Sequence, residues 1–384
     1  MKFEGGLKSK FPSMGTTIFS VMTALAKEFN AINLAQGFPE YNPHPALIES
    51  FSNALKSNNN QYAPMQGWLP LREAIAAKIE LLYGLNINPD HEITITAGGT
   101  QAIFTAIAAL VKEGDEVIVF SPAYDSYVPS IELMGAKPVF YNMDAPDFLI
   151  DWNKVTKLIS QKTKMVIINT PHNPTARVLT NDDLNKLAKL LQGSDILVLS
   201  DEVYEHIVFD DKKHVSVLSH KELCNRSIAI YSFGKTYHAT GWKVGYVVAP
   251  ENITTEFRKV HQYNVFSIST PAQIAFTEIL EKSDLYLELS SFYQEKRNYF
   301  RSAISTSNLT LLECEGTYFQ LVSYDKISDK KDLDFAKWLT REKGVAAIPI
   351  SVFYNKTIDT KVVRFCFAKE EETLKKAAEW LSKV

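Results

Sequence analysis

Val117-Ile118-Val119-Phe120 and Met165-Val166-Ile167-Ile168 are two short stretches of sequence in which every residue is apolar. A strand with one face in water alternates apolar and polar residues, whereas a strand covered by helices on both faces is apolar throughout. Both stretches therefore predict buried strands in the centre of a mostly parallel sheet.

Similar β-branched runs occur on either side of these stretches, and longer helix-like segments separate them. Helices are predicted to begin at Gly99, Asp151 and Asn181. Strands that alternate with helices are typical of an α/β domain with a largely parallel sheet. The predicted strands are Ile93–Thr96, Glu116–Phe120, Lys164–Ile168, Ile196–Ser200, Ser227–Ser232 and Val244–Val248.

The pattern changes after Ser283, where long helical segments and a few strands replace the alternation. This change predicts a large domain over residues 46–282 and a smaller α+β domain that combines residues 1–45 with residues 283–384. The expected helix and strands of the smaller domain lie near Leu285–Ser302, Tyr318–Val322 and Val362–Phe367.

The composition is that of an ordinary globular enzyme. The chain has 384 residues, of which 46% are hydrophobic and 22% charged, enough for two domains. A formal net charge of -3 leaves no basic excess to neutralise a nucleic-acid backbone or an anionic membrane surface. We therefore expect neither nucleic acid nor membrane as a partner.

Cysteine and histidine usage indicates neither a disulfide framework nor a metal site. The three cysteines, Cys224, Cys314 and Cys366, are widely separated, and the eight histidines show no metal-ligand spacing. Met1–Phe11 shows no targeting pattern, and the longest apolar stretch, Ala102–Val111, is too short to cross a bilayer. The sequence thus predicts a cytoplasmic protein without a metal.

Ligands in sheets of this kind bind beyond the carboxyl ends of the strands. Polar residues that directly follow a predicted strand are therefore the first candidates for a functional site. They are Gly98-Gly99-Thr100, Tyr124, Asn173, Asp201, Tyr204, Ser232 and Lys235.

The most informative segment is Ser232-Phe-Gly-Lys-Thr-Tyr-His-Ala-Thr-Gly-Trp-Lys-Val-Gly-Tyr246. Ala229–Thr236 satisfies a relaxed P-loop pattern, which would make the protein an NTPase. A P-loop must run directly into a helix whose N-terminus holds the phosphates. Here Gly241, Gly245 and an apolar strand follow within a short distance, so the sequence leaves no room for a helix.

Two other interpretations of the segment centre on Lys235. Ser232 and Lys235 match the Ser-x-x-Lys motif of penicillin-binding proteins, but the Ser-Asp-Asn and Lys-Thr-Gly tripeptides of those enzymes are absent. A lysine that forms a Schiff base needs an amine fixed at a strand end, close to hydroxyl groups and cations that bind phosphate. Lys235 meets this requirement.

The segment around Lys235 closely resembles the cofactor-lysine motif of fold type I aminotransferases, in particular class I/II. The nearest branch contains kynurenine aminotransferase, glutamine transaminase K and bacterial methionine aminotransferases. Lys243 stands where the common motif has Arg, although this branch also tends to carry Lys there. The other matching motifs are Asn33-Leu-Ala-Gln-Gly-Phe-Pro39, Gln61-Tyr-Ala-Pro64, Asn169-Thr-Pro-His-Asn-Pro174, Ser200-Asp-Glu-Val-Tyr-Glu205 and Val363-Arg-Phe-Cys-Phe367.

The resemblance implies a large domain with a mostly parallel seven-stranded sheet, a small α+β domain, and pyridoxal 5′-phosphate (PLP) carried by Lys235. In the family, the residue matching Asp201 pairs with the pyridine nitrogen of PLP and keeps the ring cationic. Tyr204 and Asn173 match residues that bind its phenolic oxygen, and Tyr124 matches the aromatic stacked on the ring. Taken alone, Asn173 is better explained as a turn former between two prolines, and an aromatic after a strand, such as Tyr124, is often a core residue.

Binding of the cofactor phosphate is expected at Gly99 and Thr100, where a strand gives way to a helix N-terminus that favours anions. Ser232 would add a hydroxyl, and Lys243 a point charge without the bidentate geometry of arginine. The resemblance implies that Tyr62 reaches the phosphate from the neighbouring subunit of a homodimer with shared active sites. The plainer interpretation of Tyr62 is loop packing.

The substrate is expected to bind beside the cofactor. Arg364 lies in an apolar run where an unpaired guanidinium would be costly, and the family supplies the substrate α-carboxylate as its partner. A structural ion pair is the alternative. Gly37 would let the backbone approach this carboxylate, and Asn173 would also contact the substrate. The resemblance to the branch implies that Phe19 and Phe266 contact the amino acid side chain, with Phe266, or both residues, contributed across the dimer.

The resemblance implies an aminotransferase that moves the amino group of an L-amino acid to a 2-oxo acid through PLP by a ping-pong mechanism. Methionine, aromatic amino acids, glutamine and kynurenine are the expected donors. A carbon-sulfur β-lyase acting on cysteine conjugates uses the same lysine and is the main alternative. A non-catalytic regulator built on this fold and a P-loop NTPase are more remote ones.

Overall fold

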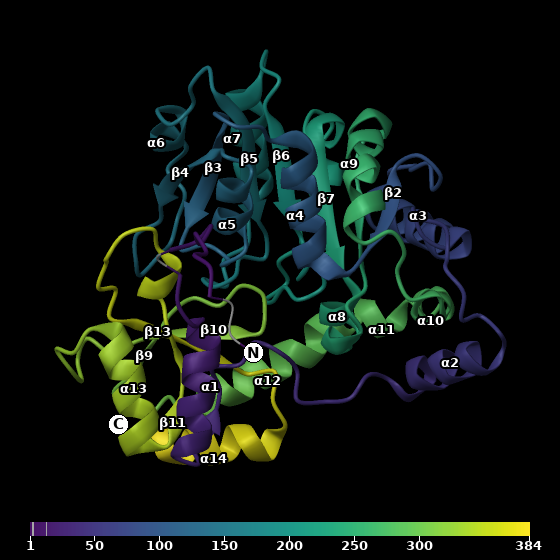
Figure 1. Ribbon diagram of the computed structural model, residues 1–384. Helices are drawn as coiled ribbons and strands as arrows, with labels where there is room; N and C mark the ends of the chain where they lie inside the picture. Colours follow the sequence, from purple (N-terminus) through teal and green to yellow (C-terminus); the bar gives the residue numbers. More distant parts are fainter. Residues whose placement is uncertain (2–3, 13) are drawn as a thin grey trace.

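The computed structural model describes residues 1, 4–12 and 14–384 of the chain. Lys2, Phe3 and Ser13, which the sequence assigns to the small domain, lie outside the described residues. A large twisted sheet with helices on both faces occupies one part of the molecule, and the C-terminal elements form a smaller body at one edge of this sheet (Figure 1).

The large sheet has seven strands, as the family resemblance implies, whereas the sequence pattern predicts six of them. Strand β8 is antiparallel to both of its neighbours, and all other neighbouring pairs are parallel. In spatial order the strands are β2 (Ile93–Thr96), β8 (Gly245–Val248), β7 (Ser227–Ser232), β6 (Leu197–Asp201), β5 (Thr163–Asn169), β3 (Glu116–Ser121) and β4 (Lys137–Asn142). The edge strand β4 was not among the predicted strands, because its half-exposed sequence lacks the apolar run of the central strands.

Alternate residues of the central strands belong to two separate apolar clusters. Val117 and Met165 pack in one cluster, and their neighbours Ile118 and Val166 pack in the other. Both faces of these strands are therefore buried, which confirms the prediction made from their apolar sequences. The helices of this part are α2 (Pro45–Lys56), α3 (Leu69–Tyr83), α4 (Gly98–Leu110), α5 (Tyr127–Leu133), α6 (Trp152–Thr156), α7 (Asn181–Leu191), α8 (Phe233–Thr236), α9 (Glu251–Asn264) and α10 (Thr270–Leu280).

The predicted helix starts agree with the structure to within one residue. Helix α4 begins at Gly98, and α7 begins at Asn181. Asp151 caps α6, because its side chain accepts a hydrogen bond from the Asn153 backbone N–H. The expectation that no helix fits after β7 was wrong in detail. The four-residue helix α8 forms there and ends before His238, whose φ is +56°.

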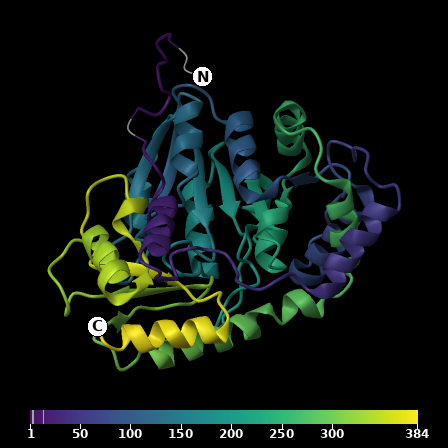
Figure 2. The ribbon, with the colours of Figure 1, turned by 60° about the horizontal axis from the view of Figure 1, so that its bottom comes forward.

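The smaller body is built on a four-stranded sheet with antiparallel neighbours, in the order β12, β13, β10 and β9. The N-terminal strand β1 (Ile32–Asn33) pairs with β11 (Val345–Ala346). Helix α1 (Ile18–Glu28) packs against α13 and lies beside the yellow-green elements in Figure 2. The remaining elements are β9 (Thr310–Leu311), β10 (Phe319–Ser323), β12 (Ile348–Pro349), β13 (Val362–Cys366), α11 (Asp284–Leu287), α12 (Leu289–Ala303), α13 (Asp332–Lys343) and α14 (Glu371–Leu381).

These contacts support the proposed domain division without fixing its limits. Residues 18–33 pack with the C-terminal body, whereas α2, which begins at Pro45, packs against α10 of the large part. We keep 46–282 for the large domain, and 1–45 with 283–384 for the small domain, as a proposal. Among the described residues, no helix is long and apolar enough to cross a membrane.

Candidate active site

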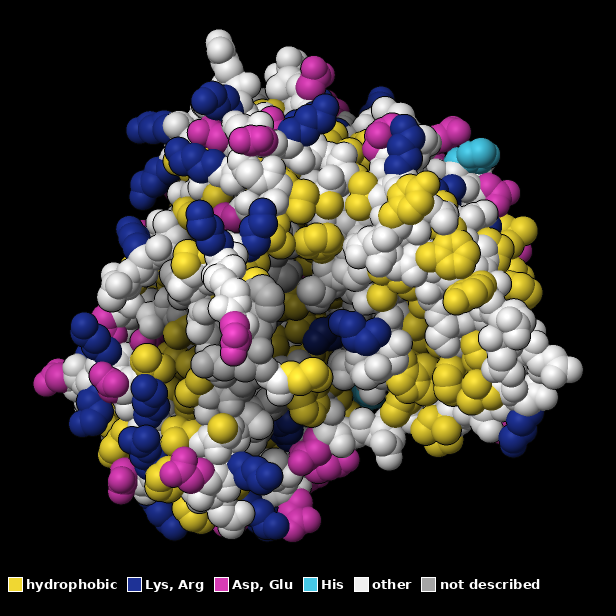
Figure 3. Space-filling model, in the orientation of Figure 1, with side chains coloured by type: hydrophobic (Ala, Val, Ile, Leu, Met, Phe, Trp, Pro, Cys, Tyr) yellow, Lys and Arg dark blue, Asp and Glu magenta, His cyan; other side chains and the backbone are white. Residues whose placement is uncertain are grey.

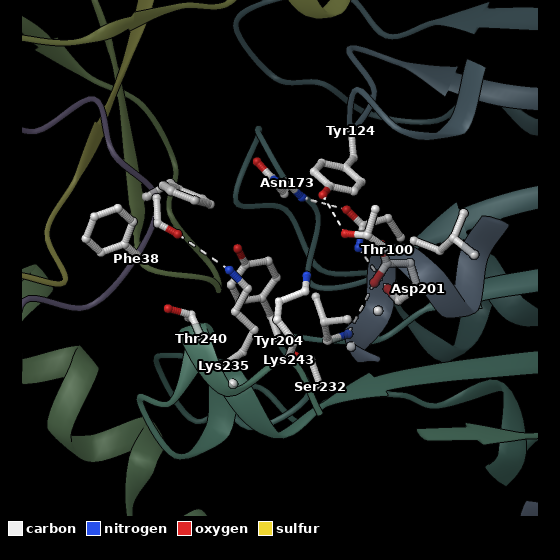
Figure 4. A pocket seen from close by; sticks show the side chains of 18 of the residues that line it. Phe38, Thr100, Tyr124, Asn173, Asp201, Tyr204, Ser232, Lys235, Thr240 and Lys243 are labelled. Carbon is white, nitrogen blue, oxygen red and sulfur yellow. Dashed lines mark hydrogen bonds between the residues drawn. The ribbon is translucent and has the colours of Figure 1, made fainter. Parts of the chain in front are cut away.

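A cavity of about 270 Å³ lies where the carboxyl ends of the parallel strands face the smaller body (Figure 4). The large sheet contributes residues that follow β3, β5, β6 and β7, and the smaller body contributes α1, β10 and β13. The predicted site residues that line the cavity are Phe19, Gly37, Gly99, Thr100, Tyr124, Asn173, Asp201, Tyr204, Ser232, Lys235, Lys243 and Arg364.

One end of the cavity is suited to an anion. Helix α4 begins there at Gly98, and no side chain of the described residues caps it, so the backbone N–H groups of its first turn can bind an anion. Gly98 has a φ of +77°, and a Cβ there would lie 3.5 Å from the Lys243 Nζ atom. The Thr100 hydroxyl lies 3.0 Å from the Tyr124 hydroxyl. Ser232, at the end of β7, completes this group of donors.

Asp201 supplies a buried carboxyl group at the end of β6. Burial raises its pKa to about 6, although a hydrogen bond from the Tyr127 hydroxyl to Oδ2, 2.6 Å long, favours the charged form. Asn169 Nδ2 donates to the Asp201 backbone carbonyl at 2.8 Å and holds the strand end. A cation placed against this carboxylate would be strongly favoured because little water competes.

Lys235 lies in α8 and points into the cavity (Figure 4). Burial lowers the pKa of its amine to about 8. The amine donates to the Tyr318 hydroxyl at 2.9 Å and lies 3.5 Å from the Gly37 carbonyl oxygen. It also lies over the Tyr204 ring, 5.5 Å from the ring centre. An amine that loses its proton near pH 8 can act as a nucleophile and as a base under mild conditions.

Arg364 lies on β13 with only 1% of its surface exposed. Its Nη1 atom donates to Asn173 Oδ1 at 2.7 Å, and its guanidinium lies 3.8 Å from the centre of the Phe319 ring. Its Nε and Nη2 atoms are buried and have no hydrogen-bond partner within the described chain. Since burial without partners is costly, these two donors favour a carboxylate ligand. A Cβ at Gly37 would lie 3.7 Å from Nη2, so glycine keeps this space open.

Comparison with known proteins identifies the family. The chain matches the family "Aminotransferase class I and II" over residues 30–381. The chain belongs to this family. The fold type I resemblance stated above is thereby confirmed, since the architecture and the family agree.

Several class I and II aminotransferases align with nearly the whole chain. Methionine aminotransferase of Escherichia coli (strain K12) is 50% identical, with 97% of each chain covered. The human enzyme kynurenine–oxoglutarate transaminase 1 is 34% identical, with 94% of this chain and 93% of the human enzyme covered. A crystal structure of an Escherichia coli protein with a methionine aminotransferase function superposes with a TM-score of 0.97 at 50% identity, covering 98% of this chain and 99% of that one.

This class I/II aminotransferase is therefore an enzyme that transfers amino groups between amino acids and oxo acids, and its family depends on PLP. Neither the β-lyase nor the NTPase alternative finds support in the comparisons. Within the described parts of the chain, no group of three or more His, Cys, Asp or Glu side chains could hold a metal ion.

The cavity of this aminotransferase fits PLP on structural grounds. The backbone N–H groups at the start of α4 and the Lys243 amine suit a phosphate, and the Asp201 carboxylate suits a protonated pyridine nitrogen. Lys235 offers a half-buried amine in the same cavity, and Tyr124 offers an aromatic face (Figure 4). Each chemical part of PLP thus has a counterpart among the lining residues.

Tyr62 and Phe266 are the two predicted site residues that do not line the cavity. Their rings pack edge to face with centres 5.2 Å apart, and Tyr62 is 82% exposed. The single chain therefore does not place them at its own site. Their expected contribution across a dimer interface stays a prediction.

Several residues of the site were not predicted from the sequence. Tyr127 and Tyr318 bind Asp201 and Lys235 through their hydroxyls, and Phe38 and Phe319 line the apolar side of the cavity. Asn169 could have been found, because it ends β5 in the same way that Asp201 ends β6.

Proposed function

We propose that this aminotransferase prefers methionine and aromatic amino acids as amino donors, with glutamine and kynurenine as further donors, and uses PLP held by Lys235. The observation that carries the proposal is the lining of the cavity. The two close relatives named above act on methionine and kynurenine by their names, which agrees with this preference.

PLP supplies an electron sink that stabilises the charge left on the substrate when its Cα proton is removed. We infer that Gly99, Thr100, Ser232 and Lys243 hold its phosphate through the donors at the start of α4 and beside it. Asp201 binds the ring nitrogen and keeps it protonated. Tyr204 and Asn173 hold the phenolic oxygen, and Tyr124 covers one face of the ring.

The reacting substrate is held and deprotonated by residues of this chain. Arg364 binds the α-carboxylate with the donors that lack a partner in the protein, while Asn173 and Gly37 fix its position. Lys235, once its amine is free and neutral, takes the Cα proton and would then deliver it to C4′ of the cofactor instead of restoring it to Cα. Its pKa of about 8 leaves a useful fraction of neutral amine at physiological pH.

The space for the substrate side chain is apolar. Phe19, Phe38 and Phe319 line it. The positively charged side chains among the described lining residues are Lys235, Lys243 and Arg364, and each of them already has a role. A distal carboxylate, as in aspartate, would therefore be buried without a partner at a cost of several kcal/mol. A thioether or an aromatic ring instead gains dispersion and sulfur-aromatic contacts.

Methionine and phenylalanine are expected to have a kcat/KM at least about tenfold higher than that of aspartate, a difference of about 1.4 kcal/mol. Parallel kinetics with methionine, phenylalanine, kynurenine and aspartate against one common 2-oxo acid measure this difference. A preference for aspartate would contradict the proposed substrate class.

We also propose a homodimer with active sites at the subunit interface. Tyr62 and Phe266 are exposed next to each other, and the nearby Tyr263 is 90% exposed. Figure 3 shows many apolar side chains on the face beside the central hollow, over the region of α2, α3 and α10. Tyr62 is useful as a phosphate ligand only if a second subunit brings it to the cavity.

The active species is expected to sediment as a dimer, and Tyr62→Phe should weaken PLP binding by about tenfold because one hydrogen bond to a charged group is lost. Analytical ultracentrifugation combined with PLP titration tests both statements. Full activity in a species that sediments as a monomer would refute the shared site.

A further inference from the structure

The Tyr318 hydroxyl connects Lys235, Gly37 and Tyr204 through hydrogen bonds, a junction that has no role in the mechanism proposed above. Tyr318 lies directly before β10, and its side chain is fully buried. Its hydroxyl donates to the Gly37 carbonyl at 2.8 Å, and it accepts from Lys235 Nζ at 2.9 Å and from the Tyr204 hydroxyl at 3.5 Å. A phenol has one proton and two acceptor positions. The Tyr318 hydroxyl therefore uses its proton and both acceptor positions, and one acceptor position binds the catalytic amine of Lys235.

This junction connects three parts of the chain that are far apart in sequence. Lys235 lies in α8, directly after β7 of the large sheet, Gly37 lies in the N-terminal segment beside Arg364, and Tyr318 belongs to the smaller body. Burial raises the pKa of Tyr318 well above its ordinary value, so its hydroxyl stays neutral. It can orient a neighbouring amine but cannot replace that amine as a base.

We propose that Tyr318 is a positioning residue that holds the Lys235 amine while this amine carries the Cα proton of the substrate. The inference rests on the proposed role of Lys235. In that step the Cα–H bond breaks, an N–H bond forms on Nζ, and the electron pair of the broken bond stays with the substrate. The neutral amine becomes an ammonium ion in a half-buried position, where a charge without acceptors is costly.

Tyr318 and Gly37 provide acceptors for this ammonium ion. The phenolic oxygen lies 2.9 Å from Nζ, and the Gly37 carbonyl oxygen lies 3.5 Å from it. Hydrogen bonds to the charged form raise the pKa of an amine, whereas burial lowers it to about 8. Tyr318 thus favours the protonated amine, so that Lys235 can hold the proton between its removal from Cα and its delivery to the cofactor.

The Tyr318 ring also has a packing role, which a test must separate from the role of the hydroxyl. The ring packs edge to face against Phe319 and Tyr204, with centres 4.9 Å and 5.2 Å away, and it lies 5.6 Å from the Tyr293 ring. Tyr318→Phe keeps all these contacts and removes only the oxygen. Tyr293→Phe is a matched control, because the buried Tyr293 hydroxyl has no hydrogen-bond partner within the described chain.

The first readout uses the enzyme without cofactor. Competitive labelling with acetic anhydride over a range of pH, followed by mass spectrometry of the Lys235 peptide, gives the pKa of this amine. In Tyr318→Phe the pKa is expected to fall from about 8 to about 7, since loss of one charge-assisted hydrogen bond corresponds to about one pKa unit. Tyr293→Phe is expected to leave it unchanged.

The second readout uses the enzyme with PLP bound. In Tyr318→Phe we expect kcat for methionine to fall about tenfold with little change in KM, and the isotope effect with Cα-deuterated methionine to increase. An unchanged pKa of Lys235 together with an unchanged kcat would overturn the proposal. Reduction with borohydride reports separately on the proposed function, because an adduct on another lysine would refute the role of Lys235 itself.

Discussion

Replacement of Lys235 by alanine is expected to lower kcat with every amino donor by about four orders of magnitude, the upper range for loss of a general acid–base group. Lys235 is a half-buried lysine of the cavity, with a pKa of about 8 and its Nζ atom directed into the cavity. Without it, water would have to move the Cα proton. The decrease in kcat is measured by rapid mixing of enzyme and methionine and observation of a single turnover to the oxo acid.

Lys235→Arg serves as the charge-conserving comparison. It keeps a positive charge but does not release a proton near neutral pH, so it is expected to be as inactive as Lys235→Ala. Lys259→Ala, at an exposed position on α9, is the control for substitution of a lysine and should behave like the unchanged enzyme. Activity of Lys235→Ala within tenfold of that level would contradict the proton-transfer role.

Replacement of Asp201 by asparagine is expected to lower kcat by about three orders of magnitude while the protein stays folded. This is the scale for removing a preorganised group that stabilises charge in the transition state. Asparagine is nearly isosteric and can still accept the hydrogen bond from Tyr127, so only the charge is lost. Steady-state kinetics with methionine measure the effect, and circular dichroism verifies the fold.

The pH dependence of PLP binding separates the charge of Asp201 from its packing. Its pKa of about 6 means that the carboxylate predominates above pH 6, and PLP binding to the cofactor-free enzyme should weaken as the pH falls through this value. Tyr127→Phe removes a hydrogen bond that favours the carboxylate, so the same weakening should begin at a higher pH. A binding curve that does not respond to Tyr127→Phe would exclude this electrostatic role.

The central strands could be predicted because a strand that is buried on both faces has apolar residues at every position. Val117 and Ile118 face opposite clusters, so both had to be apolar. Asp201 and Ser232 could be placed at the site because parallel strands bring their carboxyl ends to one edge of the sheet. The edge strand Lys137–Asn142 lacks a continuous apolar run, because much of it is exposed to solvent.

Hydrogen bonds between distant segments could not be predicted in this way. The contacts of Tyr127 with Asp201 and of Tyr318 with Lys235 depend on side-chain directions in elements that only the folded chain brings together. Arg364 is intermediate, because the cost of a buried guanidinium predicted a missing anionic partner, and the structure leaves two of its donors free. Tyr62 lies outside the cavity of a single chain, so one chain alone does not define its role.

Borohydride reduction of the enzyme with PLP bound, followed by proteolysis and mass spectrometry, tests the central claim most directly. Reduction converts a Schiff base into a stable secondary amine, which marks the lysine that carried the cofactor. The expected result is a single pyridoxyl-modified peptide that contains Lys235, which follows β7 and donates to the Tyr318 hydroxyl. A modified peptide that contains Lys243 or any other lysine instead would contradict the account.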